Sequence, residues 1–171
     1  MDNLYLVAAI GRSGELGLDN HLIWRIKEDL SFYRQVTYGK NIIMGRKTFE
    51  SMPPKALEGR NIFVLSSKEL DKHYDVNSFT NIESLIEYIK LHNDEFFIVV
   101  GGSQVYEELL PYVSSMYLTE IDENAEADTF FPYFDESEFD INTIYKNNKI
   151  EYLDNEEIPY VRNWYIRKRV K

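Results

Sequence analysis

Short apolar runs that alternate with helix-like segments restrict the fold of this chain more than any other feature. Residues 4–10 form a continuous apolar run of strand length, and similar runs occupy 41–44, 61–65 and 96–100. Consecutive apolar positions are typical of a strand that is covered on both faces. With helical segments between these runs, the pattern predicts an α/β protein with a mostly parallel sheet.

The C-terminal third of the chain follows a different pattern. Residues 140–145, a turn at Asn147-Asn148 and the run 160–166 are typical of antiparallel strands. We therefore expect a mixed sheet that ends in a hairpin. No linker rich in Pro, Gly or Ser divides the 171 residues, so we expect one domain.

Composition excludes several classes of function. Acidic residues outnumber basic ones by 29 to 19, and a net charge of -10 repels a nucleic-acid backbone. The sequence has no cysteine, and its three histidines lack metal-ligand spacing, so we expect neither thiol chemistry nor a metal site. Without a span of about 18 apolar residues or a basic leader, we expect no membrane association and a cytoplasmic protein.

The segment 11–25 links the first strand to the first helix without clear periodicity. It holds Leu16, Leu18, Leu22 and Trp24, which a purely solvated loop has little reason to carry. Long connections without regular structure are usually disordered or cover a site. We favour a lid, and a solvated loop is the alternative.

Asp29 stands on the apolar face of the first helix, which is predicted over about 26–36. Ile26, Leu30 and Tyr33 share that face by their spacing. A carboxylate there needs a cation or hydrogen-bond donors, so a ligand with paired donors is one interpretation. The other is that the helix begins later and Asp29 is its N-cap. Spacing alone does not separate the two.

Two strand-to-helix junctions could bind anions. At 99–106 a buried strand passes through Gly101-Gly102 into a helix, where backbone N–H groups could face a phosphate, although tight packing explains such a glycine pair equally well. Neither the P-loop nor the GxGxxG pattern is present. At 44–48 two cations and a hydroxyl begin a helix, and Ser66, Ser67 and Lys68 end the next strand. A solvated loop is the alternative there.

In order, these segments resemble dihydrofolate reductase. The resemblance rests on 7–9, Leu16-Gly17, Trp24, Asp29-Leu30, 44–51, Gly59-Arg60, 65–67, 100–102 with Tyr106, and 117–119 before 128–132. It covers the chain almost end to end. It implies a single-domain mixed eight-stranded sheet flanked by about four helices, with a C-terminal antiparallel hairpin. It also implies NADPH as cofactor, dihydrofolate as substrate, antifolate inhibitors as further small-molecule ligands, and a monomer that binds neither nucleic acid nor membrane.

The resemblance assigns Asp29 as the pterin-binding carboxylate, with Thr119 as its hydrogen-bond partner and Arg60 as the clamp for the glutamate carboxylate. The remaining pocket residues that it implies are Val7, Ala8, Leu30, Tyr33, Leu57 and Val100. The cofactor-binding residues that it implies are Ala9, Leu16, Gly17, Asn20, Leu22, Gly45, Arg46, Lys47, Thr48, Leu65, Ser66, Ser67, Gly101, Gly102, Ser103, Gln104, Val105, Tyr106 and Thr129. Arg46 and Ser67 would read the 2′-phosphate.

By the same resemblance, hydride passes from the nicotinamide to pterin C6 while N5 gains a proton. Asp29 would polarise the pterin, and water near Leu22 and the Trp24 lid would deliver the proton. Tyr106 would pack beside the nicotinamide, and the Gly101-Gly102 bond would be cis. The alternatives are a pyrimidine reductase of riboflavin synthesis, a non-catalytic module that binds a nucleotide or pterin, and a plain interaction protein.

Overall fold

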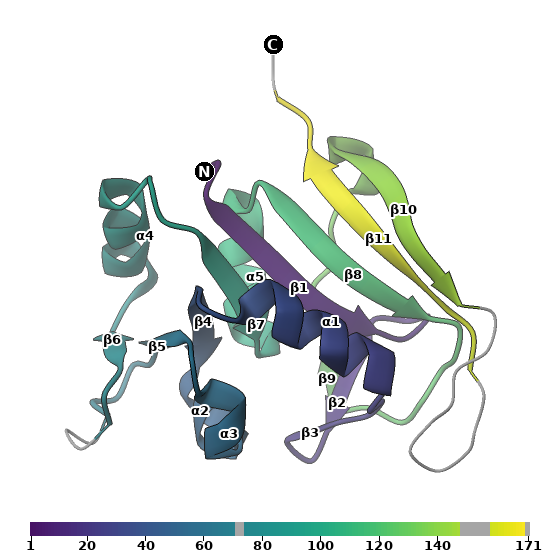
Figure 1. Ribbon diagram of the computed structural model, residues 1–171, viewed down its shortest axis with the longest axis horizontal. Helices are drawn as coiled ribbons and strands as arrows, with labels where there is room; N and C mark the ends of the chain where they lie inside the picture. The colour runs from purple at the N-terminus through teal and green to yellow at the C-terminus, as the bar shows by residue number, and fades with distance from the viewer. Residues whose placement is uncertain (71–73, 148–157, 170–171) are drawn as a thin grey trace.

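A mixed eight-stranded sheet forms the centre of the computed structural model, which describes residues 1–70, 74–147 and 158–169 (Figure 1). The strand order is β10-β11-β8-β1-β7-β4-β5-β6. The strands of this sheet are β1 (Leu4–Ile10), β4 (Asn41–Gly45), β5 (Asn61–Leu65), β6 (Asn77–Phe79), β7 (Phe97–Gly101), β8 (Ser115–Ile121), β10 (Phe139–Asn147) and β11 (Tyr160–Arg167). The predicted eight-stranded mixed sheet is confirmed.

The four apolar runs in the sequence form the middle of this sheet. They correspond to β1, β4, β5 and β7, and β1 is parallel to both of its neighbours, β7 and β8. At the C-terminal edge, β11 is antiparallel to β8 and to β10, as predicted. The expected turn at Asn147 is wrong, because Asn147 still pairs with Tyr160 in the ladder. Asn148 lies outside the described residues.

Helices cover both faces of the sheet because side chains of β1 alternate between them. Leu4 and Leu6 pack with residues of α4 and α5, whereas Val7 packs with residues of α1 and α2. The helices are α1 (Lys27–Thr37), α2 (Arg46–Ser51), α3 (Pro54–Leu57), α4 (Ile82–Leu91) and α5 (Ser103–Leu109), with 3-10 turns η1 (Leu110–Tyr112) and η2 (Glu136–Glu138). The described residues thus hold five α-helices, where about four were expected. Pro53 ends the α2 segment, and Pro54 begins α3 as a separate helix.

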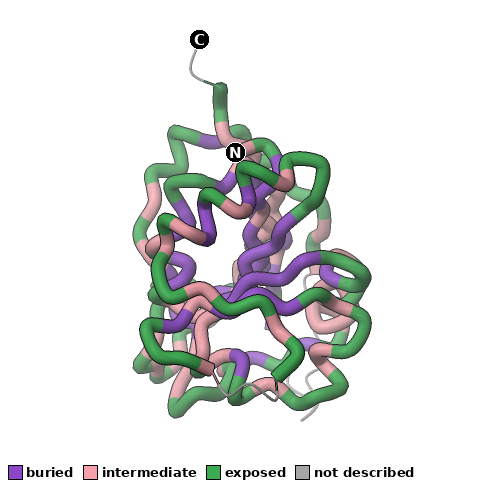
Figure 2. Tube along the Cα trace, turned by 90° about the vertical axis from the view of Figure 1, so that its left-hand side faces the viewer, coloured by how far each residue is buried: buried purple, intermediate pink, exposed green. Residues whose placement is uncertain are grey.

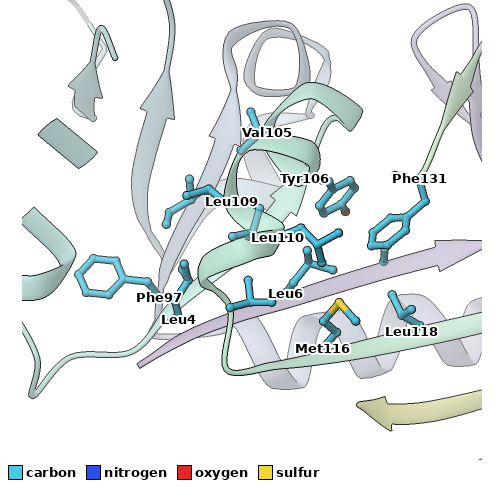
Figure 3. Close-up of a cluster of buried hydrophobic side chains, with 14 of the residues drawn as sticks. Leu4, Leu6, Phe97, Val105, Tyr106, Leu109, Leu110, Met116, Leu118 and Phe131 are labelled. Atoms are coloured by element: carbon cyan, nitrogen blue, oxygen red, sulfur yellow. The ribbon is translucent and has the colours of Figure 1, made fainter. Parts of the chain in front are cut away.

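The larger core lies between the sheet and helices α4 and α5. Figure 3 shows Leu109 and Leu110 packed over Leu6 and Met116, all of them buried. Each fully buried side chain of this size contributes about 2 kcal/mol relative to exposure. In Figure 2 the buried trace runs through the central strands, and exposed residues lie at the periphery. This packed centre positions the strand ends that carry the candidate site.

The segment predicted as a lid without regular structure instead contains a hairpin. It forms a second sheet of order β3-β2-β9, from β2 (Glu15–Leu18), β3 (His21–Leu22) and β9 (Thr129–Phe130). Its turn residues Asp19 and Asn20 have φ of 51° and 62°, as a two-residue type I′ turn requires. Aspartate and asparagine tolerate that conformation, so the local sequence did carry a hairpin signal.

Candidate functional site

A cavity of about 640 Å³ opens where the C-terminal ends of β4, β5 and β7 meet the β2–β3 hairpin. Ligands of open α/β sheets usually bind at such strand ends. The lining includes nearly every residue expected to hold the cofactor: Leu16, Gly17, Asn20, Leu22, Gly45, Arg46, Lys47, Thr48, Leu65, Ser66, Ser67, Gly101, Gly102, Ser103, Gln104, Val105, Tyr106 and Thr129. Of that predicted set, only Ala9 does not line it.

Sequence reasoning missed part of this lining. His21 and Arg25 come from the lid, and Thr80, Asn81 and Ile82 come from the start of α4. Asn81 is the N-cap of α4 and accepts a hydrogen bond from the Ser84 backbone N–H at 2.9 Å. A cap of this kind marks where a helix begins but gives no sign that this end faces a cavity. The remaining missed residues are Ser51, Met52, Pro53 and Glu108.

Two glycines leave space in the cavity wall that a side chain would occupy. A Cβ on Gly102 would lie 3.2 Å from Thr48 Oγ1, and one on Gly45 would lie 3.2 Å from Val105 Cγ2. Gly101 has a φ of 118°, which L side chains rarely adopt. The Gly101-Gly102 peptide bond is cis, as the resemblance implied. A ligand can therefore approach the backbone closely at this point.

Polar groups gather at the ends of β4 and β5. Arg46 Nη1 donates to both carboxylate oxygens of Glu50 at 2.8 Å, and Lys47 is exposed. The Ser66 hydroxyl is buried and donates to the Lys68 carbonyl at 2.7 Å, while Ser67 is exposed. Cations and hydroxyls in this arrangement suit a ligand with phosphate groups.

Asp29 is the third residue of α1, and the N-cap of that helix is Ile26. The alternative that Asp29 is the N-cap is therefore wrong. Its side chain is 18% exposed, and Oδ1 accepts hydrogen bonds from Thr119 Oγ1 at 2.5 Å and from Arg162 Nη2 at 2.9 Å. The predicted contact between Asp29 and Thr119 is present in the structure.

Arg162 and Glu28 were not identified from the sequence. Arg162 is 1% exposed and forms a two-bond fork with Glu28, at 3.0 Å from Nη1 to Oε1 and 2.8 Å from Nη2 to Oε2. The pKa of Glu28 is lowered: burial alone would raise it, but hydrogen bonds from Arg162 and Tyr160 outweigh that effect. One signal was available, since Arg162 shares a strand face with Tyr160 and Trp164.

Arg60 lies at the other end of α1. Its Nε donates to Thr37 Oγ1 at 2.9 Å and Nη1 donates to the Glu58 carbonyl at 2.9 Å, while the guanidinium lies over the Tyr33 ring at 5.8 Å. These contacts hold Arg60 on the side of the sheet where Val7 packs with α1. Leu57 and Tyr33 are half-buried against the same cluster.

Tyr106 and Trp24 are both held by hydrogen bonds. The Tyr106 hydroxyl donates to the Val7 carbonyl at 2.8 Å, and burial raises the pKa of that phenol far above 10. Trp24 is buried, and its Nε1 donates to Glu123 Oε2 at 2.7 Å. Leu22, by contrast, is 57% exposed on the hairpin. Because burial raises its pKa, Tyr106 stays protonated at neutral pH.

Several predicted residues lie outside the large cavity. They come from β1, α1, α3, the segment between α3 and β5, and β8, and they are Val7, Ala8, Asp29, Leu30, Tyr33, Leu57, Arg60 and Thr119, with Trp24 from the segment 11–25. Val100 and Tyr106 line the cavity, and Tyr106 is hydrogen-bonded to Val7 of this set. The described residues contain no cluster of metal-ligating side chains, and no helix among them could cross a membrane.

Fold and site together define an α/β protein with one mixed sheet, a phosphate-suited cleft at its strand ends and a half-buried carboxylate beside that cleft. The family model described as dihydrofolate reductase matches residues 3–167. This chain belongs to the dihydrofolate reductase family.

Named relatives agree with this assignment. The chain is 36% identical over 132 residues to the dihydrofolate reductase of Buchnera aphidicola, covering 77% of this chain and 80% of the relative. It is 37% identical over 123 residues to that of Bacillus subtilis, covering 71% of each. The Staphylococcus haemolyticus protein is 31% identical over 167 residues, covering 97% and 95%.

A solved structure extends the similarity to three dimensions. Dihydrofolate reductase from Enterococcus faecalis, complexed with NADP(H) and RAB-propyl, matches with a TM-score of 0.82 and 28% identity. The match covers 97% of this chain and 96% of the other. The eight-stranded architecture and its chain order are therefore those of this family.

Proposed function

We propose that this chain, as one domain over 1–171 and as a monomer, reduces 7,8-dihydrofolate to 5,6,7,8-tetrahydrofolate with NADPH. The observation that carries the proposal is Asp29, whose carboxylate is held on one oxygen by Thr119 and Arg162 beside a cleft of cofactor dimensions. Such an acceptor suits a flat heterocycle that presents adjacent N–H groups. Family membership supports the same reaction.

The cleft residues fit NADPH. The cleft has a volume of about 640 Å³, which lies within the range of cofactor sites. Gly45 and Gly102 leave the backbone accessible at points where a Cβ would contact a neighbouring side chain. Arg46, Lys47 and Ser67 would hold the 2′-phosphate, and Thr48 with the 102–105 backbone would hold the pyrophosphate. When bound, NADPH supplies the hydride that reduces pterin C6.

The chain's own residues would orient the substrate and control water. Asp29 would accept hydrogen bonds from the 2-amino group and ring nitrogen of the pterin, and Arg60 would pair with the glutamate carboxylate. Tyr106, protonated and tied to Val7, would act by packing and not as an acid. Water admitted near Leu22 would bring the proton to N5, and Trp24 would close the lid against bulk solvent.

The direct test follows NADPH absorbance with dihydrofolate for the wild type, Asp29→Asn and Asp122→Asn. We expect turnover by the wild type and a loss of kcat/KM of about 100-fold or more for Asp29→Asn at neutral pH. Asp122 is an exposed aspartate that pairs with Arg12, so its variant should match the wild type.

Three results would redirect the proposal. Equal rates for wild type and Asp29→Asn would remove the role given to Asp29. Binding of NADPH and folate without turnover in any variant would favour a non-catalytic binding module. Turnover of a riboflavin-type pyrimidine in place of dihydrofolate would favour the pyrimidine reductase.

A further inference from the structure

Arg162 carries a positive charge in the interior next to the candidate substrate site. Its side chain is 2% exposed, and the guanidinium lies 3.9 Å from the centroid of the Phe32 ring. A buried cation costs several kcal/mol unless it is fully paired. Burial alone would lower the pKa of Arg162, but hydrogen bonds to Glu28 and Asp29 outweigh that effect and raise the pKa above the ordinary value of an arginine. Arg162 therefore remains charged.

Two carboxylates share this one cation. The Glu28 carboxylate accepts hydrogen bonds from both Nη1 and Nη2 of Arg162, and Asp29 Oδ1 accepts a further hydrogen bond from Nη2. The Tyr160 hydroxyl also donates to Glu28, so Glu28 is the fully paired counter-ion of Arg162. With Glu28 in that role, the cluster keeps one negative charge, which resides beside the cleft on Asp29.

The hydrogen-bond directions fix the Asp29 carboxylate. Arg162 Nε can only donate, so at 3.0 Å the Thr119 oxygen must accept from it. The Thr119 proton is then committed to Asp29 Oδ1, at 2.5 Å. Oδ1 thus receives two donors, whereas Oδ2 has no hydrogen-bond donor among the residues that the structure describes.

We propose that Arg162 is a positioning residue for the reaction: with Glu28 as counter-ion and Thr119 as intermediary, it saturates Oδ1 of Asp29 and leaves Oδ2 open to the pterin. This inference rests on the proposed function and deepens it. Glu28 and Asp29 are adjacent on α1, and Thr119 and Arg162 are paired neighbours on β8 and β11. The cluster therefore joins α1 to strands β8 and β11 at the point where the substrate would bind.

The test compares Arg162→Met, Arg162→Lys and the control Arg167→Met. Arg167 lies on the same strand and is equally well bound, to Glu138, Val113 and Leu110, at the end remote from Asp29. We expect Arg162→Met to lower kcat/KM for dihydrofolate about 10- to 100-fold while the NADPH Kd changes less than about twofold. Arg162→Lys should recover part of the loss, since it retains charge without the fork. Arg167→Met should lower stability only.

A double-mutant cycle separates positioning from simple destabilisation. In an Asp29→Asn background, Arg162→Met should cause little further loss of kcat/KM, because the group that it positions is already changed. A purely structural role would give additive losses and would weaken NADPH and dihydrofolate alike, and that result would overturn the inference. If Arg162→Met does not fold, the cycle is run with Arg162→Lys.

Folate binding distinguishes failure of this inference from failure of the proposed function. A wild type that binds folate without reducing dihydrofolate refutes the proposed function only. The folate Kd, followed by tryptophan fluorescence, should still rise about tenfold or more in Arg162→Met and not in Arg167→Met. Equal folate Kd values in wild type and Arg162→Met would overturn the positioning role, whatever the turnover.

Discussion

Charged side chains at the cleft pair with one another, and Arg46 is the clearest case. Both carboxylate oxygens of Glu50 accept hydrogen bonds from Arg46 Nη1. The Arg46 side chain is 31% exposed and the Glu50 side chain is 44% exposed. Ion pairs this exposed contribute at most about 1 kcal/mol. A phosphate group could therefore compete with Glu50 for Arg46, and under the proposed function the strength of that competition would set part of the cofactor affinity.

Replacing Arg46 by Ala should weaken NADPH selectively. An arginine–phosphate hydrogen bond contributes about 1.5–3 kcal/mol, so we expect the NADPH Kd to rise about tenfold or more. The Kd of NADH, which lacks the 2′-phosphate, should change by less than about twofold. Fluorescence titration of both nucleotides measures this difference, and equal weakening would contradict the 2′-phosphate assignment.

Replacing Glu50 by Gln gives the matched companion variant. It frees Arg46 without removing a cation, so the NADPH Kd should fall a few-fold and the NADH Kd should stay constant. Weaker NADPH binding in Glu50→Gln would show that the ion pair orients Arg46 for the phosphate and does not compete with it.

For single residues, the sequence predicted which side chains have a chemical role better than it predicted which side chains they contact. The stripe on α1 singled out Asp29 because a carboxylate on an apolar face is unusual, and the structure supplies its donors. Arg162 could not be paired with Asp29 by spacing, because the two are 133 residues apart and meet only through the β8–β11 ladder. Glu28 likewise looked like an ordinary charge at a helix start.

Among the elements, the β2–β3 hairpin belongs to the proposed lid, and contacts with Asp128 anchor it. Asp128 Oδ2 accepts from the Asp19 backbone N–H at 3.0 Å, and the Asp128 backbone N–H donates to the Gly17 carbonyl at 3.1 Å. The turn at Asp19 therefore has to keep its left-handed conformation for both contacts to form. Strain in this turn should act on lid closure without reaching the main core.

Asp19→Val tests the turn. A β-branched residue with a φ near 51° costs about 1–2 kcal/mol, which corresponds to a roughly 5- to 30-fold lower kcat/KM if lid closure is required. The urea midpoint should stay near that of the wild type. Asp19→Gly, which loses the same carboxylate but accepts the conformation, should retain most of the activity. Equal losses in both variants would assign the effect to the carboxylate.

The sequence identified this element by its apolar content but missed its regular structure. Leu16 and Trp24 are buried, which agrees with their apolar character. The hairpin depends on a two-residue turn, and the only sequence signal for that turn is the pair Asp19 and Asn20. Its partner strand, β9, has two residues and no periodicity. The short edge strand β6 escaped detection for the same reason.

For the molecule as a whole, carboxylates that are held by hydrogen bonds in the folded state make stability depend on pH in the acid range. Glu15 is 3% exposed. Burial alone would raise its pKa, but hydrogen bonds from the Asn124 amide and from backbone N–H groups of Ser13 and Ala125 outweigh it and lower the pKa below 4.5. The pKa of Glu28 is lowered as well. Both groups therefore stabilise the fold only when they are ionised.

The sign of this linkage gives a prediction. A lowered folded-state pKa contributes stability above about pH 4.5, the unfolded value, and that contribution is lost as the pH falls through the folded pKa. Urea unfolding at pH 7, 5.5 and 4 should show a drop mainly in the last step. Glu15→Gln should lower stability at pH 7 by about 1–3 kcal/mol and show a shallower acid dependence.

Glu107→Gln, at an exposed position on α5, is the control and should follow the wild type at each pH. A Glu15→Gln variant with the full wild-type acid dependence would assign the effect to other carboxylates.

At the scale of the whole fold, pattern predicted most of the architecture. The runs at 4–10, 41–44, 61–65 and 96–100 became the central strands because continuous apolar character requires cover on both faces. The end of β10 was misplaced, since Asn147 is a common turn residue yet remains in the ladder opposite Tyr160. Side-chain composition indicates that a strand exists more reliably than it indicates where the strand ends.

The central claim is that one site holds the nicotinamide against the pterin, so that hydride passes directly between them. It is tested by turnover in ordinary water with NADPH that carries deuterium at both C4 positions of the nicotinamide. We expect mass spectrometry of the tetrahydrofolate product to show one deuterium, bound at C6, with the N5 proton drawn from water. Tetrahydrofolate without deuterium at C6, or no tetrahydrofolate at all, would contradict the proposed reaction.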